Sequence, residues 1–458
     1  MIFQIFVDRF AGPGGAPLDP PPPDAGWRHH CGGTLDGIVA RLDHIVRLGA
    51  GAIYLTPIFR AASNHKYDTT DFDNVDPAFG GNGAFERLAA ACRARGIGLI
   101  LDGVFNHVGR SHPWFAAAVS DPQSREYAYF KWQSHPHDYS CWRGHGNLPE
   151  VNLSNPHVRK ELFEGDDSVV RRWLRRGATG WRLDCANDLG IENCRAIAAA
   201  VRAENAPDGA IGEVMSYADD WLGEGGLDGV MNYYFRETVV GLVSGDVPIA
   251  QAAYNLKRMA RAYPREGLLR SWNMLASHDT PRLATLVPDR ARRAMAFALA
   301  FAYPGVPMIY YGEAIGMPGG PDPLNRGPMQ WDESSWDIEM FEHIRKLAAA
   351  RMTHAVLREG NYLALPQPGS PAIVVFARTN GRPQEIVLVV ANASDAPARA
   401  RIFAPYAHLF DGLPLKDILE VQPATKVVSG RFDVELPPWG IALYSPDNMS
   451  IRGYSFFR

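Results

Sequence analysis

Four short polar segments carry the side chains best suited to acid–base or nucleophilic chemistry. Each follows or closes a short apolar stretch typical of a β-strand, so each is expected where a strand ends. Taken singly, every one has a structural alternative as a helix N-cap, an ion pair or a turn. The segments are DGVFNH with Asp102, Asn106 and His107, GWRLDCAND with Arg182 and Asp184, IGEV with Glu213, and LASHDTPR with His278 and Asp279.

Together the segments supply carboxylates, an arginine and two histidines, a set that suits glycoside hydrolysis. That reaction passes through an oxocarbenium-like transition state and uses a carboxylate on each side of the scissile bond. Arg182 and Asp184 are two residues apart on one predicted strand, so their side chains point the same way. We expect Asp184, beside a permanent cation, to stay ionised as the nucleophile. Glu213 needs a raised pKa to protonate the leaving oxygen as the general acid.

The other polar side chains are expected to hold the reacting sugar. Asp279 would bind its hydroxyl groups. His107 and His278 would donate hydrogen bonds that strengthen in the transition state.

The chain around these segments alternates short apolar strands with amphipathic helices, the pattern of βα units and a parallel sheet. Eight such units predict an α/β fold with a (β/α)8 TIM barrel, whose functional side chains gather at the carboxyl ends of the strands. Strands are expected at Phe3–Val7, Ala52–Leu55, Gly98–Asp102, Gly180–Asp184, Ala210–Val214, Gly229–Asn232, Leu275–Ser277 and Met308–Tyr311. Helices are expected at Leu35–Leu48, Ala84–Arg95, Val158–Arg176, Ile191–Glu204 and Arg290–Ala302.

Two departures from the βα rhythm predict further domains. The connection after the third strand is long and rich in Trp, His, Pro and Ser, which predicts a small inserted domain over residues 108–156. From about Gly360 the sequence changes to alternating strands with turn residues between them, which predicts a C-terminal all-β sandwich over 360–458. The barrel would then comprise residues 1–107 and 157–359.

Composition and charge narrow the classes of partner. The chain has 458 residues, a formal net charge of -4 and a pI near 6.4, which argue against nucleic acid or an acidic membrane surface as a partner. No apolar run approaches the roughly 20 residues of a membrane span. Five cysteines without a CxxC pair indicate reduced thiols, and no leader sequence is recognisable. We therefore expect a cytoplasmic protein whose partner is a neutral oligosaccharide.

All four segments, in this order, resemble the motifs of the α-amylase superfamily, glycoside hydrolase family 13, and the resemblance covers essentially the whole chain. It implies Asp184 as nucleophile, Glu213 as acid/base and Asp279 as transition-state stabiliser. His107, Arg182 and His278 would contact the reacting glucose. The segment SNHKYDT is similar too, and implies Tyr67 as an aromatic platform under that ring and Asp68 as a support for Arg182. Without the motif, Tyr67 would be read as a half-buried loop aromatic.

Finer features resemble the cyclomaltodextrinase, neopullulanase and maltogenic amylase branch. They are IYLTPIFRAASNHKYDT, LPEVNLSNP, the AND after Asp184, and SHDTPR. The stretch GGPDPLNRGPMQW is similar to the loop on the glycone side of that branch. It implies that Asp322 and Arg326 touch the sugar beyond the cleavage site, with a surface salt bridge as the structural alternative.

The sequence also departs from the pattern of the branch. The usual N-terminal β domain is expected to be absent, because a predicted strand begins at Phe3. Calcium ligands after that strand are mostly replaced by AGPGGAPLDPPPPDAG, so no metal site is expected there, although Asn106 stays open as a ligand. Met215 stands where the branch usually has a tryptophan that stacks on the leaving sugar, which predicts an altered substrate preference. Glu150 replaces a lysine, with no effect that we can assign.

Three hypotheses of function follow. The leading one is a retaining hydrolase of small or cyclic maltooligosaccharides that cuts α-1,4 and, as a second linkage, α-1,6 bonds. The second is a transglycosylase or isomerising α-glucosyl transferase, since retaining chemistry allows a sugar to replace water as acceptor. The third is a non-catalytic sugar-binding barrel. No cofactor is expected to be required, calcium being optional at most, and a homodimer stays open.

Overall fold

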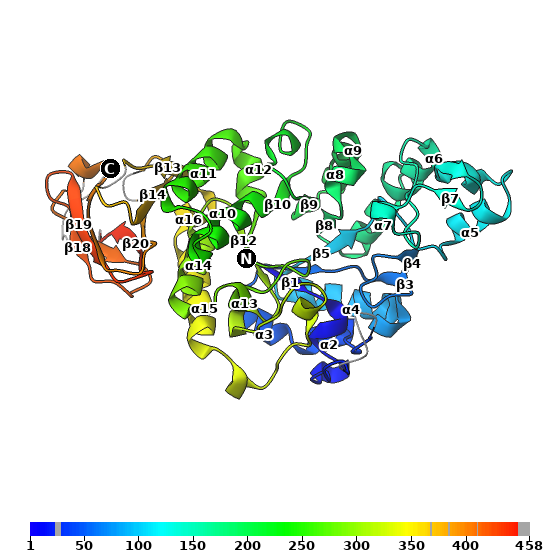
Figure 1. Cartoon of the computed structure of the whole chain (residues 1–458), viewed down its shortest axis with the longest axis horizontal. Coiled ribbons are helices and arrows are strands. Elements are labelled where there is room, and N and C mark those ends of the chain that lie inside the picture. The colour runs from blue at the N-terminus through cyan, green and yellow to red at the C-terminus, as the bar shows by residue number, and fades with distance from the viewer. Residues whose placement is uncertain (23–28, 367–368, 383–384, 410, 448–458) are drawn as a thin grey trace.

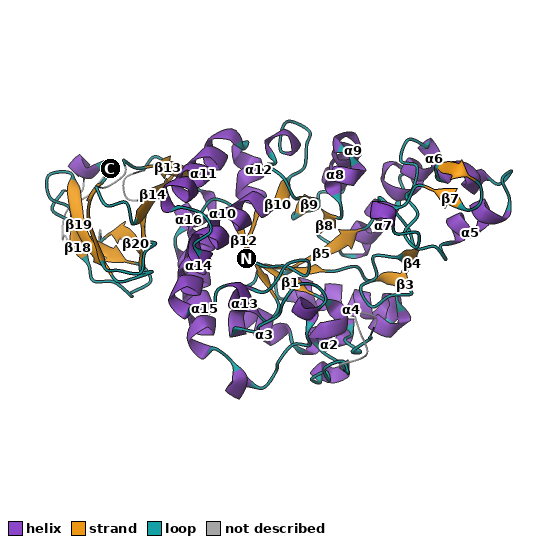
Figure 2. Cartoon of the chain, viewed as in Figure 1, coloured by secondary structure: helices purple, strands orange, loops and turns teal. Residues whose placement is uncertain are grey.

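Within the residues that the computed structural model describes (1–22, 29–366, 369–382, 385–409 and 411–447), eight parallel strands close into a barrel. Their order around the barrel is β1-β12-β11-β10-β9-β8-β5-β2, and the predicted TIM barrel is confirmed (Figures 1 and 2). The strands are β1 (Ile2–Ile5), β2 (Ala52–Leu55), β5 (Gly98–Gly103), β8 (Gly180–Leu183), β9 (Gly209–Val214), β10 (Gly229–Asn232), β11 (Trp272–Met274) and β12 (Val306–Tyr310).

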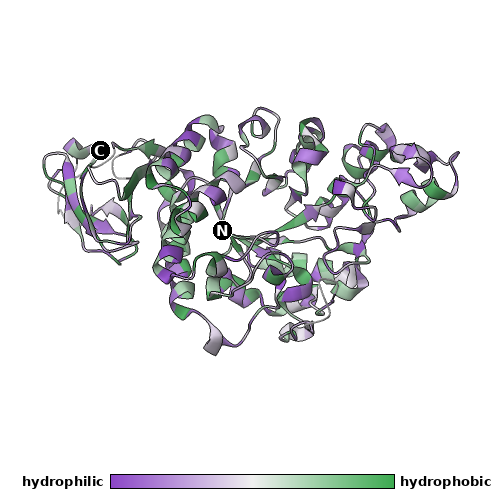
Figure 3. Ribbon diagram, in the orientation of Figure 1, coloured by the Kyte–Doolittle hydropathy of each residue, from purple (hydrophilic) through white to green (hydrophobic). Residues whose placement is uncertain are grey.

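Helices surround the barrel and bury their apolar faces against it. The ribbon in Figure 3 is largely green on the central strands and alternates between green and purple on the surrounding helices. The longer helices are α4 (Gly81–Ala94), α7 (Val169–Arg176), α9 (Ile191–Ala203), α10 (Tyr233–Ser244), α11 (Ile249–Ala262), α14 (Arg290–Ala302) and α15 (Ile338–Thr353). The shorter ones are α1 (Val7–Phe10), α2 (Leu35–Ala40), α3 (Leu42–Arg47), α6 (Pro156–Arg159), α8 (Ala186–Leu189), α12 (Arg265–Arg270), α13 (Leu283–Leu286) and α16 (Ala355–Glu359). None of the described helices combines the length and the apolar character that crossing a bilayer requires.

Alternation along each strand divides the core into two layers. On β1, Ile2 packs inside the barrel, whereas Phe3 and Ile5 pack outside it against the helices. Tyr54 on β2 and Met274 on β11 belong to the same interior cluster. Because side chains two apart on a strand share a face, polar residues placed after the interior apolar ones emerge at the rim of the barrel.

The prediction for the seventh barrel strand was wrong by three residues. It placed the strand at Leu275–Ser277, whereas β11 is Trp272–Met274. The polar Asn273 in the middle of the strand conceals it, because the side chain points away from the barrel interior. Its amide nitrogen donates to the carbonyls of Ala300, Tyr303 and Pro304 at 3.2–3.4 Å, which satisfies the buried donor.

Two predicted helices are broken. The stretch expected as one helix over Val158–Arg176 consists of α6, a π-helical turn at Lys160–Glu164 and α7, with extended backbone at Gly165 and Ser168 between them. The stretch Leu35–Leu48 is interrupted at Arg41 into α2 and α3. Apolar periodicity runs through both breaks, so sequence pattern alone does not reveal them.

The small insertion after β5, the third barrel strand, is confirmed. It contains α5 (Pro113–Ser120), β6 (Trp132–Ser134) and β7 (Asp138–Tyr139), and extends to one end of the molecule in Figure 1. Phe115 packs against Trp132 and Tyr139, which gives the insertion its own aromatic core. A β-bridge between His107 and Glu150 joins its start to its end beside the barrel mouth. A further pair, β3 (Phe59–Ala61) and β4 (Thr69–Val75), lies in the loop after β2.

The C-terminal antiparallel domain is also confirmed, and its described strands form two packed sheets. One has the order β13-β14-β15-β20-β17-β18 and the other pairs β16 with β19. Side chains of both sheets share one core, with Leu388 from β15 and Ile402 from β16. Residues 448–458 and residues 23–26, the end of the predicted Pro/Gly-rich stretch, lie outside the described residues. The strands are β13 (Asn361–Ala364), β14 (Ile373–Thr379), β15 (Ile386–Asn392), β16 (Ala398–Phe403), β17 (Pro414–Asp417), β18 (Thr425–Lys426), β19 (Arg431–Leu436) and β20 (Ile441–Pro446).

Candidate active site

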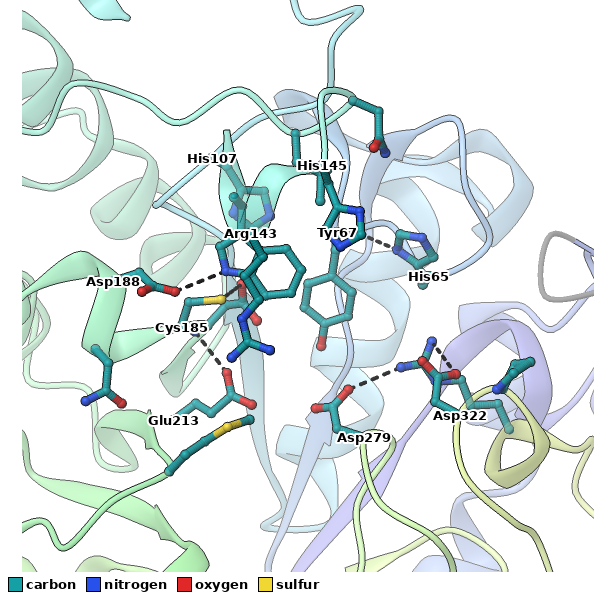
Figure 4. Close-up of a pocket in the computed structure, with 18 of the residues that line it drawn as sticks. His65, Tyr67, His107, Arg143, His145, Cys185, Asp188, Glu213, Asp279 and Asp322 are labelled. Atoms are coloured by element: carbon teal, nitrogen blue, oxygen red, sulfur yellow. Dashed lines mark hydrogen bonds and ion pairs between the residues drawn. The ribbon is translucent and has the colours of Figure 1, made fainter. Parts of the chain in front are cut away.

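The barrel mouth contains a cavity of about 1160 Å³ in which most of the predicted site residues meet (Figure 4). Arg182 and His278 are fully buried and contact residues that line it, and Asp68 lies outside its lining. Lining residues from the inserted segment include Trp142, Arg143 and His145. The predicted residues that line the cavity are Tyr67, His107, Asp184, Glu213, Asp279, Asp322 and Arg326.

Two carboxylates face each other at the centre of this cavity. Asp184 follows β8 directly and Glu213 lies near the end of β9, the neighbouring strand. An oxygen of Asp184 lies within 4.8 Å of an oxygen of Glu213. Carboxyl groups of retaining glycosidases are about 5–5.5 Å apart, whereas inverting enzymes need roughly 6.5–9.5 Å to admit a water. The separation therefore fits the retaining arrangement.

Arg182 is the cation that binds these carboxylates together. Its Nη1 donates to Asp102 Oδ1 at 2.8 Å and to Asp184 Oδ1 at 2.9 Å. Its Nη2 lies 2.8 Å from Glu213 Oε1 without the alignment of a hydrogen bond. Asp102 pairs with Arg182 in the register of β5 and β8, so the contact follows from strand pairing.

The contact between Arg182 and Asp184 is as predicted, but it does not keep the pKa of Asp184 low. Burial raises the pKa of Asp184 to about 7, because it outweighs the stabilisation by Arg182, and the nearby Glu213 carboxylate adds to the rise. The sequence argument considered one cation and one anion. In the structure the same guanidinium also serves Asp102 and Glu213.

The expected rise in the pKa of Glu213 is found. Burial raises it, Arg182 lowers it, and the carboxylates of Asp279 and Asp102 raise it again. The Glu213 carboxylate accepts the backbone N–H of Cys185 at 2.9 Å and a longer bond of 3.4 Å from the Tyr233 hydroxyl. These donors favour the ionised form of Glu213, but burial and the neighbouring carboxylates outweigh them, so the net shift of the pKa is upward.

Asp279 lies on the opposite side of the cavity from Cys185 and Asp188 (Figure 4). Its burial raises the pKa, yet nearby positive groups, including Arg326 at 3.2 Å, lower it overall. His278 Nε2 lies 3.1 Å from Asp279 Oδ2, and burial lowers the pKa of the imidazole to about 3. Because this ring is neutral at physiological pH, we attribute the lowering to the guanidinium groups. Asp279 is therefore an ionised acceptor.

Two further predicted residues present groups to the cavity. The Tyr67 hydroxyl donates to Asp102 Oδ2 at 3.0 Å and also contacts His278 Nε2, so the two nearly parallel rings lie edge to edge with centroids 5.6 Å apart. His107 is buried, and its Nε2 has no hydrogen-bond partner within the described chain. Burial lowers the pKa of His107 to about 4, so a neutral nitrogen is left for a substrate hydroxyl.

The prediction that Asp68 supports Arg182 was wrong. The Asp68 carboxylate accepts from the backbone N–H and the hydroxyl of Ser63, which closes the loop between β3 and β4. Arg182 is instead held by Asp102, whose second oxygen accepts the hydroxyl of Tyr54 at 2.6 Å. Asp68 is near Tyr67 in sequence but points into its own loop, so proximity in the motif misled the assignment.

Asp322 and Arg326 both line the cavity and also form the ion pair that was the structural alternative. Arg326 Nη1 lies 3.2 Å from Asp322 Oδ1, and Nε donates to the backbone carbonyl of His278 at 2.9 Å. The guanidinium thereby ties the loop after β12 to the residues after β11. Asp322 is 46% exposed in its side chain, so it remains accessible to a bound sugar.

Sequence reasoning did not assign the residues of the inserted segment that line the cavity. Trp142 Nε1 donates to Asp188 Oδ2 at 3.1 Å, which ties the insertion to α8. Arg143 has left-handed backbone with φ 45° and places its guanidinium 5.0 Å from the Trp142 ring centroid. The Trp-rich composition of the insertion was the only signal, and it does not separate Trp142 from Trp132, which packs inside the insertion.

In the segment after β1, where calcium ligands were expected to be missing, a buried carboxylate binds protein groups instead. Asp8 accepts the backbone N–H groups of Cys31 and Gly32 at 3.0 and 3.1 Å, and Arg9 Nε lies 3.3 Å from its carboxylate. Calcium takes six to eight oxygen ligands. Within the described part of this region, the one buried carboxylate is already occupied by donors and the guanidinium, so these residues do not fit a calcium ion.

Comparison with known proteins identifies the family. The sequence profile described as alpha amylase, catalytic domain, matches residues 4–339. The chain belongs to the α-amylase family, glycoside hydrolase family 13. A cyclomaltodextrinase from Bacillus sp is 33% identical over 413 residues, which are 86% of this chain and 73% of that protein. Within the family, the chain lies in the cyclomaltodextrinase, neopullulanase and maltogenic amylase branch.

Solved structures of family members are similar over nearly the whole chain. The cyclic α-maltosyl-(1→6)-maltose hydrolase of Arthrobacter globiformis, in complex with that sugar, is 30% identical with a TM-score of 0.82 and covers 97% of this chain and 98% of its own. An acarbose-soaked debranching enzyme from Nostoc punctiforme is 32% identical with a TM-score of 0.84 and covers 97% of both chains. This family 13 chain is an α-glucan hydrolase related to cyclomaltodextrinases and debranching enzymes.

The sequence predicted that Asp68 supports Arg182, whereas the structure shows Asp102 in that place, so substitution of each aspartate tests the difference. Asp102→Asn removes the charge that holds Arg182, and breaking a buried pair is costly, so kcat/KM is expected to fall about 100-fold or more. The matched change Asp68→Asn leaves Arg182 untouched and should cost less than about tenfold. Initial rates of reducing-sugar release measure both, with Tm values to confirm folding. A larger loss for Asp68→Asn than for Asp102→Asn would contradict the assignment.

Proposed function

We propose that the chain is a retaining hydrolase of small or cyclic maltooligosaccharides that cleaves α-1,4 bonds and, as a second linkage, α-1,6 bonds. The observation that carries the proposal is the separation of less than 4.8 Å between the Asp184 and Glu213 carboxylates across one cavity at the strand ends. That spacing leaves no room for a water between nucleophile and sugar, so the enzyme carboxylate itself must attack.

In the first half-reaction an Asp184 oxygen attacks the anomeric carbon while Glu213 gives its proton to the glycosidic oxygen. The glycosidic bond breaks, the leaving sugar departs as an alcohol, and a covalent ester joins the glycosyl group to Asp184. In the second half-reaction Glu213, now ionised, takes a proton from water. The water oxygen attacks the same carbon, and the ester bond breaks to release the free sugar and the Asp184 carboxylate.

Hydrogen bonding supports this division of roles. Both oxygens of Asp184 have close neighbours, since Arg182 donates to Oδ1 and the Cys185 thiol lies 3.0 Å from Oδ2. Glu213 Oε1 has only a misaligned guanidinium and a 3.4 Å contact with Tyr233. Glu213 Oε2 also accepts the Cys185 N–H at 2.9 Å, but that donor is neutral, whereas the aligned donor on Asp184 is a guanidinium. Because a charged donor favours the ionised form of a carboxyl group more strongly, we place the shared proton of the pair on Glu213.

The other side chains would bind the reacting sugar. Asp279 is an ionised acceptor for hydroxyl groups, and the free Nε2 of His107 can pair with another. Tyr67 provides an aromatic face whose position is fixed by the contacts of its hydroxyl with Asp102 and His278. Asp322 and Arg326 also line the cavity and would contact the neighbouring sugar.

Two features support compact substrates. The inserted segment covers one side of the cavity with Trp142, Arg143 and His145, which limits the room for a long chain. The cavity lining also includes Met215, a residue that is 52% exposed and offers no flat platform to an extended leaving group. The relatives named for cyclic sugars lend further support.

A cytoplasmic location and a neutral oligosaccharide partner belong to the same proposal. All five cysteines are free thiols, which suits a reducing compartment. The absence of a required cofactor and the homodimer both stay predictions.

The first test replaces each central carboxyl group by its amide. Asp184→Asn and Glu213→Gln are nearly isosteric and should each lower kcat by several orders of magnitude, because nucleophile and acid are then missing. Initial rates on γ-cyclodextrin and maltotriose measure the loss, and proton NMR of early wild-type product should show the α anomer first. Near-normal rates in either variant, or a β anomer, would sink the proposal.

Substrate shape is tested with matched methionine variants. Wild type should hydrolyse at least one cyclodextrin or cyclic tetrasaccharide faster than soluble starch. Met215→Trp should supply the missing platform and raise kcat/KM for linear maltooligosaccharides by about five- to tenfold, since stacking of this kind is worth about 1 kcal/mol. Met352 is exposed and does not line the cavity, so Met352→Trp is the control. It should change neither the preference for cyclic sugars over starch nor kcat/KM for linear maltooligosaccharides. Starch turning over faster than every cyclic sugar would contradict the preference.

A further inference from the structure

Cys185 follows the nucleophile directly in the chain and, like Arg182, contacts both central carboxylates. Its backbone N–H donates to Glu213 Oε2 at 2.9 Å. Its Sγ lies 3.0 Å from Asp184 Oδ2. The side chain also lines the cavity. A single residue therefore links the two groups whose relative placement the reaction depends on.

The backbone of Cys185 adopts a conformation that side chains avoid. Its φ of 48° and ψ of 48° lie in the left-handed region, where a non-glycine residue without a compensating interaction is disfavoured. The same residue precedes α8, so the chain turns sharply here from strand β8 into a helix. In this turn the N–H reaches Glu213 while the thiol reaches Asp184, which gives the unusual backbone a use.

The thiol can only act as a donor in this position. Burial raises the pKa of Cys185 far above its usual range, and the negative Asp184 beside it raises it further. The sulfur is therefore protonated, and its S–H points to a carboxylate oxygen. Arg182 donates to the other oxygen of the same carboxylate at 2.9 Å. Donors at both oxygens fix the rotation of the Asp184 carboxylate about its side-chain bond.

The weakness of a thiol as a donor matters here. A strong donor would fix the carboxylate but would also withdraw charge from the oxygen that attacks the sugar. A thiol restrains the orientation and is easily given up when that oxygen bonds to carbon. The arrangement thus combines a fixed approach with a reactive oxygen.

We propose that Cys185 is a positioning residue that orients Asp184 through its thiol and Glu213 through its backbone N–H. The inference rests on the proposed function, because it assigns Asp184 as nucleophile and Glu213 as acid. It goes further because it assigns a role to a side chain that is neither an acid or base of the reaction nor a sugar-binding group. The two contacts differ in kind, so side-chain substitution removes one and keeps the other.

The test compares Cys185→Ala with Cys185→Ser across the pH range on γ-cyclodextrin. Alanine removes a donor to the ionised form of Asp184, so the pKa rises and the acidic limb of kcat/KM moves to higher pH by about half a unit. Misorientation of the nucleophile should lower kcat about tenfold with KM changed less than about twofold. The basic limb, which reports Glu213, should stay in place because the backbone N–H remains. Serine restores a donor and should return the acidic limb to its wild-type position or below.

Cys141→Ala is the matched control, since this half-buried thiol lies in the inserted segment without contacting either carboxylate, and its profile should match wild type. Tm values establish folding, and Cys185→Gly, which tolerates the left-handed backbone, serves as the variant without a donor if alanine does not fold. The inference would be overturned if the variant without a donor had the acidic limb and the kcat of the wild type. It would also be overturned if the acidic limb of Cys185→Ser lay where that of Cys185→Ala lies. If instead Asp184→Asn were active, the proposed function itself would fail, so the two failures are distinguishable.

Discussion

The Arg182 guanidinium lies within 2.9 Å of oxygens from three carboxylates, and all four groups are buried. One positive charge cannot neutralise three negative charges where water is excluded, so bound protons make up the difference. This explains why burial raises the pKa of Asp102 to about 6 and that of Asp184 to about 7 although both touch the same cation. A proton retained beside an ionised carboxylate is the condition that a general acid and a nucleophile together require.

The barrel provides this arrangement through the register of adjacent strands. Asp102 pairs with Arg182 across β5 and β8, and β8 pairs in parallel with β9, so three segments far apart in sequence end at one rim. The sheet fixes the backbone, and hydrogen bonds fix the side chains above it: Tyr54 and Tyr67 hold Asp102, and Cys185 holds Asp184 and Glu213. The inserted segment and the loop after β12 contribute further residues to the lining of the cavity.

The barrel, its insertion and its C-terminal strands could be predicted from alternating apolar patterns, because burial imposes those patterns directly. The clustering of Asp184, Glu213 and Asp279 could be predicted because parallel strands deliver their ends to one rim. The predictions that failed concern interactions between residues that are far apart in the sequence. Asn273 hides a strand because its amide bonds to distant carbonyls. The raised pKa of Asp184 reflects a guanidinium shared among three carboxylates, which no local motif shows.

The central claim is that Asp184 becomes covalently bound to the sugar. The most direct measurement incubates the protein with a 5-fluoro-α-glucosyl fluoride, whose glycosyl ester forms faster than it hydrolyses, and maps the label by mass spectrometry of proteolytic peptides. We predict one fluoroglucosyl group on the peptide that contains Asp184, and none in Asp184→Asn. A label on Glu213 or Asp279, or an active protein that takes up no label, would contradict the account.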